Sequence, residues 1–322
     1  MMAYVGRGLM AGIALMCAVM SPFTTAQDKR PMTLIVAYPP GGASDVTARL
    51  LAERLGNQLN RTIIVENKSG ADGTIAMQAL AKAPADGSVL GFAAVSPLAI
   101  TPHIQRLPFS LDAIAPLSPV MYSPVLYIAT PALDVKNLAA LVARARKDPG
   151  RIRAAGSGSA SLCSLALHQL QEAAGVTLTL VPYKGGGQLV TDAIGGQFEI
   201  MCINANPSLM QSFSDGKLTP LAVGAPERLA SLPNVPTLQE AGYPQANRAS
   251  VFGLFMPAGV PAEVAESLNE AINAVLQEPD FKTRLTAMGN VPMGGTARDF
   301  AQRIREESQL NEEIVQKADL AN

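Results

Sequence analysis

The sequence has no excess charge of either sign, and this limits the partners that the protein can serve. Its 322 residues include 25 Lys and Arg against 26 Asp and Glu, and 48% of them are apolar. Disordered chains contain fewer apolar residues, and broad nucleic-acid surfaces need a basic excess. A chain of this length suits two domains of ordinary size. We therefore expect a globular protein whose partners are small molecules or proteins, not nucleic acids.

The signatures of several catalytic sites are also missing. The phosphate-binding pattern GxxxxGK[ST] and the serine-hydrolase pattern GxSxG do not occur. His103 and His168 are the only histidines, and neither has Cys, Asp or a second His at metal-ligand spacing. The sequence therefore predicts no metal and no cofactor, and it gives little support to phosphate transfer or serine-based hydrolysis.

Cysteine is scarce, and no apolar run is long enough to span a bilayer. Cys17 lies in an N-terminal apolar run of roughly 13 residues, shorter than the ~20 of a membrane helix. Arg7 before this run and small or polar residues up to Ala26 are typical of a secretory signal. We expect residues 1–26 to be a signal peptide that directs export to the periplasm. For Cys163 and Cys202, one bridge and two buried free thiols both stay open.

The sequence does contain a regular alternation of apolar, β-type runs with amphipathic helical runs. This alternation indicates βαβ units with parallel strands covered on both faces. A first series lies between residues 32 and 95, and a second, similar series begins near Val120 and ends near residue 225. The sequence thus predicts an α/β fold with two domains of similar plan.

A Pro-rich stretch over residues 228–244 separates the second series from a C-terminal segment with two long amphipathic helical patterns. Such helices need a sheet to cover, so we assign this segment to the first domain. The expected division is lobe 1 at 27–122 and 252–322 and lobe 2 at 123–251, with two hinge crossings. Ligands of open α/β sheets bind beyond the carboxyl ends of the strands, which predicts a site between the lobes.

The loop YPPGGASD, residues 38–45, joins the first strand pattern to the first helix pattern. Gly41 and Gly42 let a ligand approach the backbone closely, and we expect Ser44 or Asp45 to cap the helix. The free N–H groups of the first helical turn, at the positive end of the helix dipole, suit an anion such as a carboxylate. No Lys or Arg lies in the loop. A plain strand-to-helix turn explains the same pattern equally well.

A second loop of this kind lies in the other domain. It contains Gly156, Ser157, Gly158 and Ser159, with Ser161 at the start of the following helix pattern. The hydroxyls can bind a ligand, or they can only cap the helix. Two such loops, one in each lobe, can hold a ligand from both sides of a cleft.

Two further polar residues follow strand patterns in the second domain. Lys184, in PYKGGG, can supply charge to an acidic ligand or lie in a solvated turn. Asn204, like Asn206, follows the apolar run EIMCI, where an amide can bind a ligand or cap the next turn.

Several segments, in order along nearly the whole mature chain, are similar to one known family. They are VAYPPGGASDVTARLLAERL, IIVENKSGADGTIA, APADGSVL, VPYKGGG, DAIGGQFEIM, DGKLTPLAVGAPERLASLPNVPTLQEAGYP and GLFMPAGVPAEVAESLNEAI. The chain resembles the Bug (TctC-like) extracytoplasmic substrate-binding receptors of tripartite tricarboxylate transporters. The resemblance implies a two-lobed, type II periplasmic-binding-protein fold, a Venus flytrap that closes on a small carboxylated metabolite without catalysis.

The resemblance also implies which residues bind the ligand. In the family, backbone amides of the first loop hold a carboxylate, which points to Tyr38, Gly41, Gly42, Ala43, Ser44 and Asp45. Asp45 is expected to position the loop, because its charge opposes an anion. Ser96 lies where members place a small polar residue that faces the cleft. The second-lobe loop corresponds to residues 156–161, and the loop after VPY corresponds to Lys184 and Gly185.

Three departures from the family pattern fall around the second lobe and the hinge. The second loop has no His at the helix start and two extra residues. Ile203 and Asn204 stand where many members have an Asp, and Val251 stands where many have Trp. We therefore expect the distal end of the ligand to be recognised differently.

The leading hypothesis is a monomeric receptor that delivers a carboxylate to membrane permease subunits. A ligand sensor that docks on a sensor-kinase ectodomain uses the same pocket and stays an alternative. An exported α/β hydrolase is a weaker alternative, supported only by the serine-rich loops and the two histidines.

Overall fold

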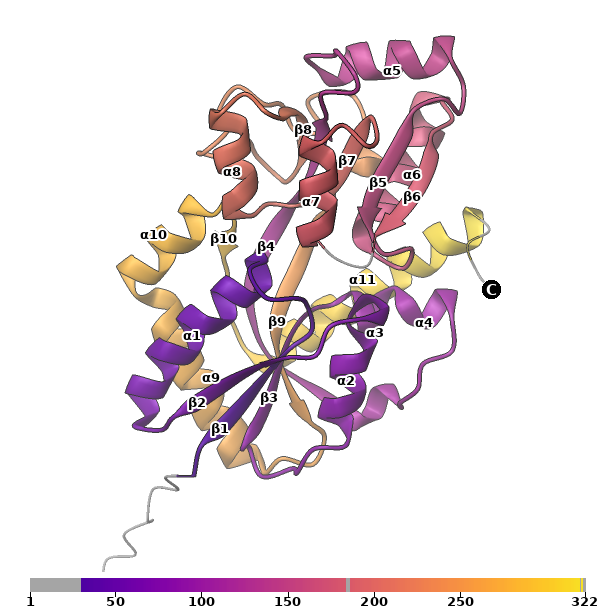
Figure 1. The fold of residues 1–322 in the computed structure, drawn as a ribbon. Coiled ribbons are helices and arrows are strands. Elements are labelled where there is room, and N and C mark those ends of the chain that lie inside the picture. The colour runs from indigo at the N-terminus through magenta and orange to yellow at the C-terminus, as the bar shows by residue number, and fades with distance from the viewer. Residues whose placement is uncertain (1–29, 184–185, 319, 321–322) are drawn as a thin grey trace, which may run out of the picture.

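Two long strands cross the middle of the molecule and join its two halves (Figure 1). The computed structural model describes residues 30–183, 186–318 and 320. The first part of β4 (Ile114–Ala129) pairs with β9 (Ala249–Pro257). The last part of β4 pairs with β7 (Ile200–Asn204) and β8 (Thr219–Gly224). One strand therefore belongs to the sheets of both halves.

The first half is built on the strand order β2-β1-β3-β9-β4. Strands β1, β2 and β3 are parallel, whereas β9 is antiparallel to β3 and β4. The carboxyl ends of the three parallel strands therefore lie at one edge, which faces the second half (Figure 1). The remaining strands of this half are β1 (Met32–Val36), β2 (Ile63–Asn67), β3 (Val89–Ala94) and β10 (Val291–Pro292), which pairs with β4.

The second half continues through β4-β7-β5-β6, and β8 pairs with the other side of β4. Strands β5 (Arg153–Ser157) and β6 (Thr179–Tyr183) are parallel, and β5 is also parallel to β7. The carboxyl ends of β5, β6 and β7 lie together and face the first half (Figure 1).

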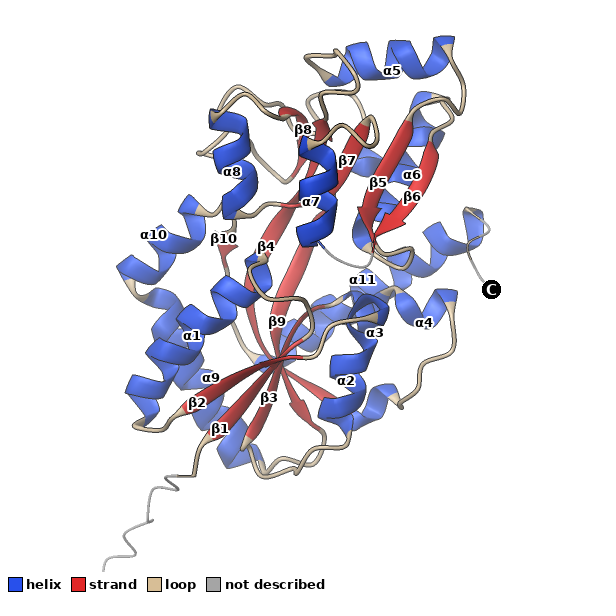
Figure 2. Cartoon of the chain, in the orientation of Figure 1, coloured by secondary structure: helices blue, strands red, loops and turns tan. Residues whose placement is uncertain are grey.

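Helices flank the strands in both halves (Figure 2). The second half has α5 (Leu138–Lys147), α6 (Leu162–Ala174), α7 (Gly186–Ile194) and α8 (Pro207–Ser214). The other helices are α1 (Ala43–Leu59), α2 (Thr74–Ala81), α3 (Ser96–Ala99), α4 (Thr101–Ile104), α9 (Ala262–Gln277), α10 (Pro279–Ala287) and α11 (Ala297–Lys317). Short 3₁₀ turns lie at η1 (Ala71–Gly73), η2 (Leu111–Ala113) and η3 (Pro244–Ala246). Within the described part of the chain, no helix combines the length and apolar character needed to cross a membrane.

Each half has its own apolar core, and α11 packs against both. Leu34 of β1 lies in a first-half cluster, and Tyr127 of β4 lies in a second-half cluster. Near the start of α11, the ring of Phe300 packs in the first half, whereas Ile314 and Val315 near its end belong to the second-half cluster. The C-terminal helix thus links the halves by packing, in addition to the two crossing strands. The lobe boundaries drawn from the sequence stay a prediction.

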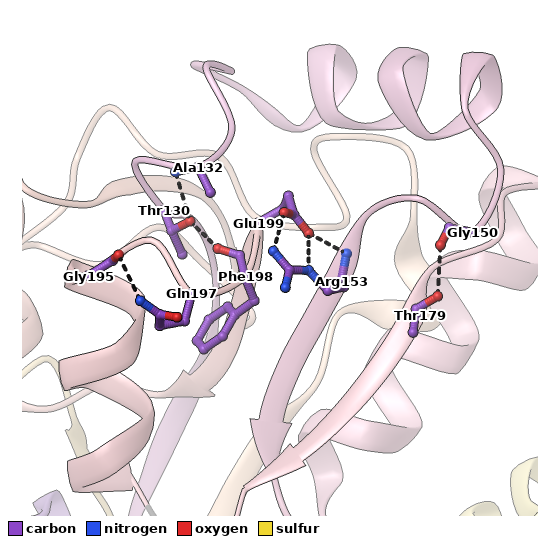
Figure 3. Close-up of polar contacts among 9 residues, drawn as sticks. All are labelled: Thr130, Ala132, Gly150, Arg153, Thr179, Gly195, Gln197, Phe198 and Glu199. Carbon is purple, nitrogen blue, oxygen red and sulfur yellow. Dashed lines mark hydrogen bonds and ion pairs between the residues drawn. The ribbon is translucent and has the colours of Figure 1, made fainter.

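Polar contacts lie at the amino ends of β5, β6 and β7, next to the residue that follows β4 (Figure 3). The Glu199 carboxylate accepts hydrogen bonds from the Arg153 backbone N–H at 2.7 Å and from its guanidinium at 2.7 and 3.0 Å. The Thr130 hydroxyl donates to the carbonyl of Phe198. These contacts fix the strands at the end remote from their carboxyl ends, where the loops described below begin.

The predicted α/β class and the two crossing strands are confirmed. The expectation of parallel pairing is wrong for β4, which is antiparallel to β7, β8 and β9. The physical reason is that β4 runs from the first half into the second, whereas β7, β8 and β9 all run in the opposite direction. The edge strand β2 also alternates between half-buried and exposed residues, so it is not covered on both faces.

Candidate functional site

A cavity of about 350 Å³ lies where the strand ends of the two halves meet. The first half contributes the loops after β1, β2 and β3, and the second contributes the loops before α6, α7 and α8. Ser250 and Phe252 of the crossing strand β9 also line it. This volume is in the range of sites for small metabolites.

The loop after β1 forms one wall and is held from behind by Asp45. Asp45 is 4% exposed, and its carboxylate accepts the Gly41 N–H at 2.9 Å and the Asn67 amide N–H at 2.8 Å. It also forms an ion pair with Arg49 at 3.0 Å. Gly41 has φ +81°, a conformation that favours glycine. The loop is therefore set in one conformation before any ligand arrives.

The pKa of Asp45 results from opposing effects. Burial alone would raise this pKa, but hydrogen bonds from Arg49, Gly41 and Asn67 outweigh burial and hold it below its ordinary value. Asp45 does not line the cavity. An ionised carboxylate thus shapes the loop without entering the cavity itself.

The expectation that Ser44 or Asp45 caps α1 is wrong. The helix begins at Ala43, and its N-cap is Gly42, so Ser44 and Asp45 lie inside the first turn. The Asp45 side chain turns back to Gly41 and Asn67 instead of capping. Among the described residues, no side chain caps this helix start, and Gly42, Ala43 and Ser44 line the cavity.

Four helices of eight or more residues place a residue of their first turn at the cavity, and the short helix α3 also begins there, at Ser96. The cavity lining includes Ala43 at the start of α1, Leu162 at the start of α6, Gly186 at the start of α7 and Ser208 in the first turn of α8. The start of a helix carries partial positive charge and free N–H groups, which bind anions. In the described part of the lining there is no Lys, Arg or His. The site therefore attracts negative charge through backbone dipoles.

Three polar side chains of the second half are fixed at the cavity wall. Ser161 caps α6 by accepting the Ser164 N–H at 3.2 Å, and Asn206 caps α8 by accepting the Leu209 N–H at 3.2 Å. The Asn204 amide donates to the Ser123 carbonyl and to the Ser250 hydroxyl, both at 2.9 Å. Asn204 is thereby tied to both crossing strands.

Apolar groups complete the wall between these polar ends. Tyr38 and Phe252 pack edge to face, with ring centroids 5.9 Å apart. Burial raises the pKa of the Tyr38 phenol, which keeps it protonated. Val190 and Ile203 lie on the second-half side. The middle of the cavity thus suits a short hydrocarbon segment.

In the described lining one residue carries a carboxylate, and the sequence hypothesis missed it. Asp72 lies in the loop Gly70-Ala71-Asp72-Gly73 between β2 and α2, and it accepts the Ala160 N–H at 3.1 Å. Burial raises the pKa of the Asp72 carboxyl. The segment GADG is a third Gly-rich loop between a strand and a helix, so the same reasoning that selected the other two loops could have found it.

Most of the other predicted residues line one of two cavities. Those that line the site are Tyr38, Gly41, Gly42, Ala43, Ser44, Ser96, Ser161 and Asn204. Gly156, Gly158 and Ser159 line a separate cavity of about 400 Å³ beside α6 and β6. Ser157 ends β5, and Lys184 and Gly185 lie outside the described residues. Lining residues that the sequence hypothesis did not select include Cys163, Gly187, Ser208, Ser250 and Phe252.

Among the described residues, the two histidines and the two cysteines form no metal-binding cluster. A ring nitrogen of His103 is 2.8 Å from the Ser308 hydroxyl, and His168 lines the separate cavity. Cys163 and Cys202 are buried free thiols, and Cys163 also lines the site. Among the described residues, no group of three or more His, Cys, Asp or Glu side chains is placed to hold a metal ion.

Comparisons with known proteins point to one family. The family model of the tripartite tricarboxylate transporter family receptor, TctC, matches residues 47–320. An R. palustris protein solved with adipate is 29% identical, with a TM-score of 0.86 over 91% of this chain and 99% of its own. The periplasmic binding protein BugD is 28% identical, with a TM-score of 0.84 over 91% and 99%. MatC from Rhodopseudomonas palustris with bound malate is 28% identical, with a TM-score of 0.81 over 89% and 99%. The predicted periplasmic-binding-protein fold and the resemblance to Bug proteins are confirmed.

Proposed function

Because the chain belongs to the tripartite tricarboxylate transporter receptor (TctC) family, we propose that its cavity binds a small carboxylate for delivery to the permease subunits of such a transporter. The observation that carries this proposal is the convergence of four helix starts on a cavity whose described lining has no basic side chain. Backbone N–H groups and helix dipoles bind a carboxylate without the need for a cation.

The arrangement of the helix starts supports a ligand with an acidic or polar group at each end. The start of α1 lies on the first-half side, and the starts of α6, α7 and α8 lie on the second-half side. Apolar contacts from Phe252 and Val190 lie between them. Adipate and malate, the ligands in two related structures, are both dicarboxylates of this general form.

We further propose that the protein acts in the periplasm and performs no catalysis. Family members are periplasmic receptors, as BugD illustrates. The predicted signal peptide, residues 1–26, lies outside the described residues. Binding and release then need only opening and closing of the halves about β4 and β9.

A thermal-shift screen on residues 27–322 tests ligand binding. We expect at least one acid among malate, adipate, succinate, citrate, glutamate, nicotinate and benzoate to raise the melting temperature. Its stabilisation should follow RT ln(1 + [L]/Kd), about 2.7 kcal/mol at a hundredfold excess over Kd. The matched control is adipamide, which has the same carbon chain as adipate without negative charge. Stabilisation by neutral ligands but by no acid would contradict a carboxylate receptor.

Two further experiments test whether the protein turns over its ligand and which membrane protein it binds. After overnight incubation, NMR of the stabilising acid should show the acid unchanged, and any turnover would favour an enzyme instead.

A pull-down of the membrane proteins encoded nearby, with and without the acid, should recover a permease subunit. Recovery of a sensor kinase alone would replace transport with sensing.

A further inference from the structure

Asp72 has an unusual backbone conformation for a residue with a side chain. Ala71 and Asp72 have φ of 44° and 52°, between Gly70 and Gly73, whose φ values are also positive. Among the described residues, Asn60 is the only other non-glycine residue with positive φ. Such conformations cost free energy and persist where the surrounding structure requires them. The cost suggests a specific role for the side chain at position 72.

The Asp72 side chain reaches from the first half to the second. Its Oδ2 accepts the backbone N–H of Ala160, 88 positions away, at 3.1 Å. Ala160 directly precedes Ser161, the N-cap of α6. An oxygen of Asp72 near the start of the helix accepts a backbone N–H there, and this hydrogen bond offsets part of the cost of burying the carboxyl group. The contact therefore favours the state in which the halves are close.

The second-half loop is shaped to admit this carboxylate. A Cβ added to Gly158 would lie 1.5 Å from Oδ1 of Asp72 and 2.4 Å from its Cγ. Gly158 also has φ +77°. Its N–H donates to the Tyr183 carbonyl at 2.8 Å, which fixes the loop against β6. Only glycine at position 158 permits the approach of Asp72 seen here.

We propose that Asp72 is a positioning residue that holds the second-half loop, residues 158–161, against the first half and so stabilises the closed form around the ligand. This inference rests on the proposed function, because closure matters only if a ligand is held between the halves. Ser161 and Leu162, at the end of the same loop, line the ligand cavity. Loss of the contact should therefore release the ligand sooner.

A double-mutant cycle measured by small-angle X-ray scattering tests the contact without any ligand. The variants are Asp72→Gly, Gly158→Ala and the two combined, on residues 27–322. Glycine at position 72 removes the carboxylate and suits the positive φ. The new Cβ of Gly158→Ala should push the halves apart, giving a larger radius of gyration. In the Asp72→Gly background the same substitution should have little effect, because the atoms that it meets are gone.

The matched control is Gly150→Ala, on the second half. Gly150 has φ +73°, and its added Cβ would meet nothing within 4 Å, so it reports the cost of backbone conformation alone. Circular dichroism checks that every variant is folded. The proposal is overturned if Gly158→Ala changes the scattering equally with and without Asp72, or changes it no more than Gly150→Ala does.

Stopped-flow kinetics with adipate and malate test the consequence for binding. Asp72→Gly should raise the dissociation rate about tenfold, as expected for the loss of one partly buried hydrogen bond, and leave the association rate nearly unchanged. Asp72→Asn keeps an acceptor oxygen and should have a smaller effect. An unchanged dissociation rate in Asp72→Gly would overturn the role in ligand retention.

The two experiments separate this inference from the proposed function. If neither acid binds the parent protein, the proposed function fails for these ligands, and the scattering cycle alone decides whether Asp72 holds the halves together. If an acid binds but the two substitutions act independently, the receptor function stands and the role of Asp72 is wrong.

Discussion

The two Gly-rich loops selected from the sequence have similar composition but different positions in the structure. Residues 39–44 of the first loop all line the cavity, and Asp45 holds that loop from behind. In the second loop, Ser161 lines the cavity, whereas Gly158 and Ser159 line a separate one. The difference arises because Asp72 packs against Gly158 from the opposite half. The composition of a loop can indicate a ligand site, but the residues that pack against the loop determine which of its atoms line the cavity.

The substitution with the largest expected effect tests whether the first loop binds its ligand by letting it approach the backbone closely. Gly42 lines the cavity, and an added Cβ would meet only the Pro39 carbonyl, at an ordinary 3.7 Å. Gly42→Val should therefore fold normally but lower affinity for the acid found in the screen by about a hundredfold or more, since the added isopropyl group fills the cavity near the anion. Calorimetric titration measures the loss.

Gly195→Val provides the matched control for this substitution. Gly195 is outside the cavity, and its added Cβ would make only contacts of 3.6 Å or longer. Its affinity should equal that of the parent protein. If Gly42→Val also binds like the parent, the first loop serves only as scaffold.

A second prediction concerns the support of the first loop, which comes from Asp45 in the same half, whereas the carboxylate that contacts the second loop, Asp72, belongs to the other half. Asp45→Ala removes a buried carboxylate that accepts hydrogen bonds from Gly41, Asn67 and Arg49. We expect the free energy of unfolding to fall by about 2–3 kcal/mol, measured by urea titration. Asp280→Ala should cost less than about 1 kcal/mol, because its ion pairs with Arg54 and Arg284 are exposed. Equal losses in the free energy of unfolding would mean that the buried hydrogen bonds of Asp45 stabilise the fold no more than the exposed ion pairs of Asp280 do.

The pH dependence of stability should have opposite signs for Asp45 and Asp72. The folded-state pKa of Asp45 is lowered, so its stabilisation is present above the ordinary carboxyl pKa of about 4 and is lost as pH falls through the lowered value. The pKa of Asp72 is raised, so the part of its contribution that depends on protonation is present below about 4 and is lost as pH rises through the raised value.

Urea unfolding of the parent, Asp45→Asn and Asp72→Asn between pH 3 and about 7 measures both signs. The advantage of the parent over Asp45→Asn should shrink toward acid pH. Its advantage over Asp72→Asn should shrink toward neutral pH. If the stability advantage of the parent changed in the same direction with pH for both variants, the two carboxylates would not have the opposite pKa shifts described above.

The smallest predicted effect compares the two helix starts. Ser161 caps α6, so Ser161→Ala should lower the free energy of unfolding by about 1 kcal/mol. Ser44 is not the cap of α1, so Ser44→Ala should cost less than about 0.5 kcal/mol. Chemical denaturation of both variants gives the comparison, and a larger loss for Ser44→Ala would restore the cap that the sequence suggested.

Much of the fold could be predicted because its signals are local. Alternating apolar and amphipathic runs indicated the βαβ units, and the loop at Gly41 and Gly42 was placed at a strand's carboxyl end. The cap of α1 could not be predicted, because Asp45 bonds Asn67, which lies 22 positions further along the chain. The Asp72 contact was missed for the same reason, since its partner Ala160 belongs to the other half.

By itself, the sequence determined the α/β architecture, the family resemblance and the absence of Lys and Arg from the first loop, because periodicity and composition act over short distances. Only the tertiary structure decided that four helix starts meet at one cavity, that Gly158 faces Asp72, and that α11 joins the two cores. These features depend on how the two halves lie against each other, and that placement is set by the crossing strands β4 and β9 and by packing between residues far apart in the chain.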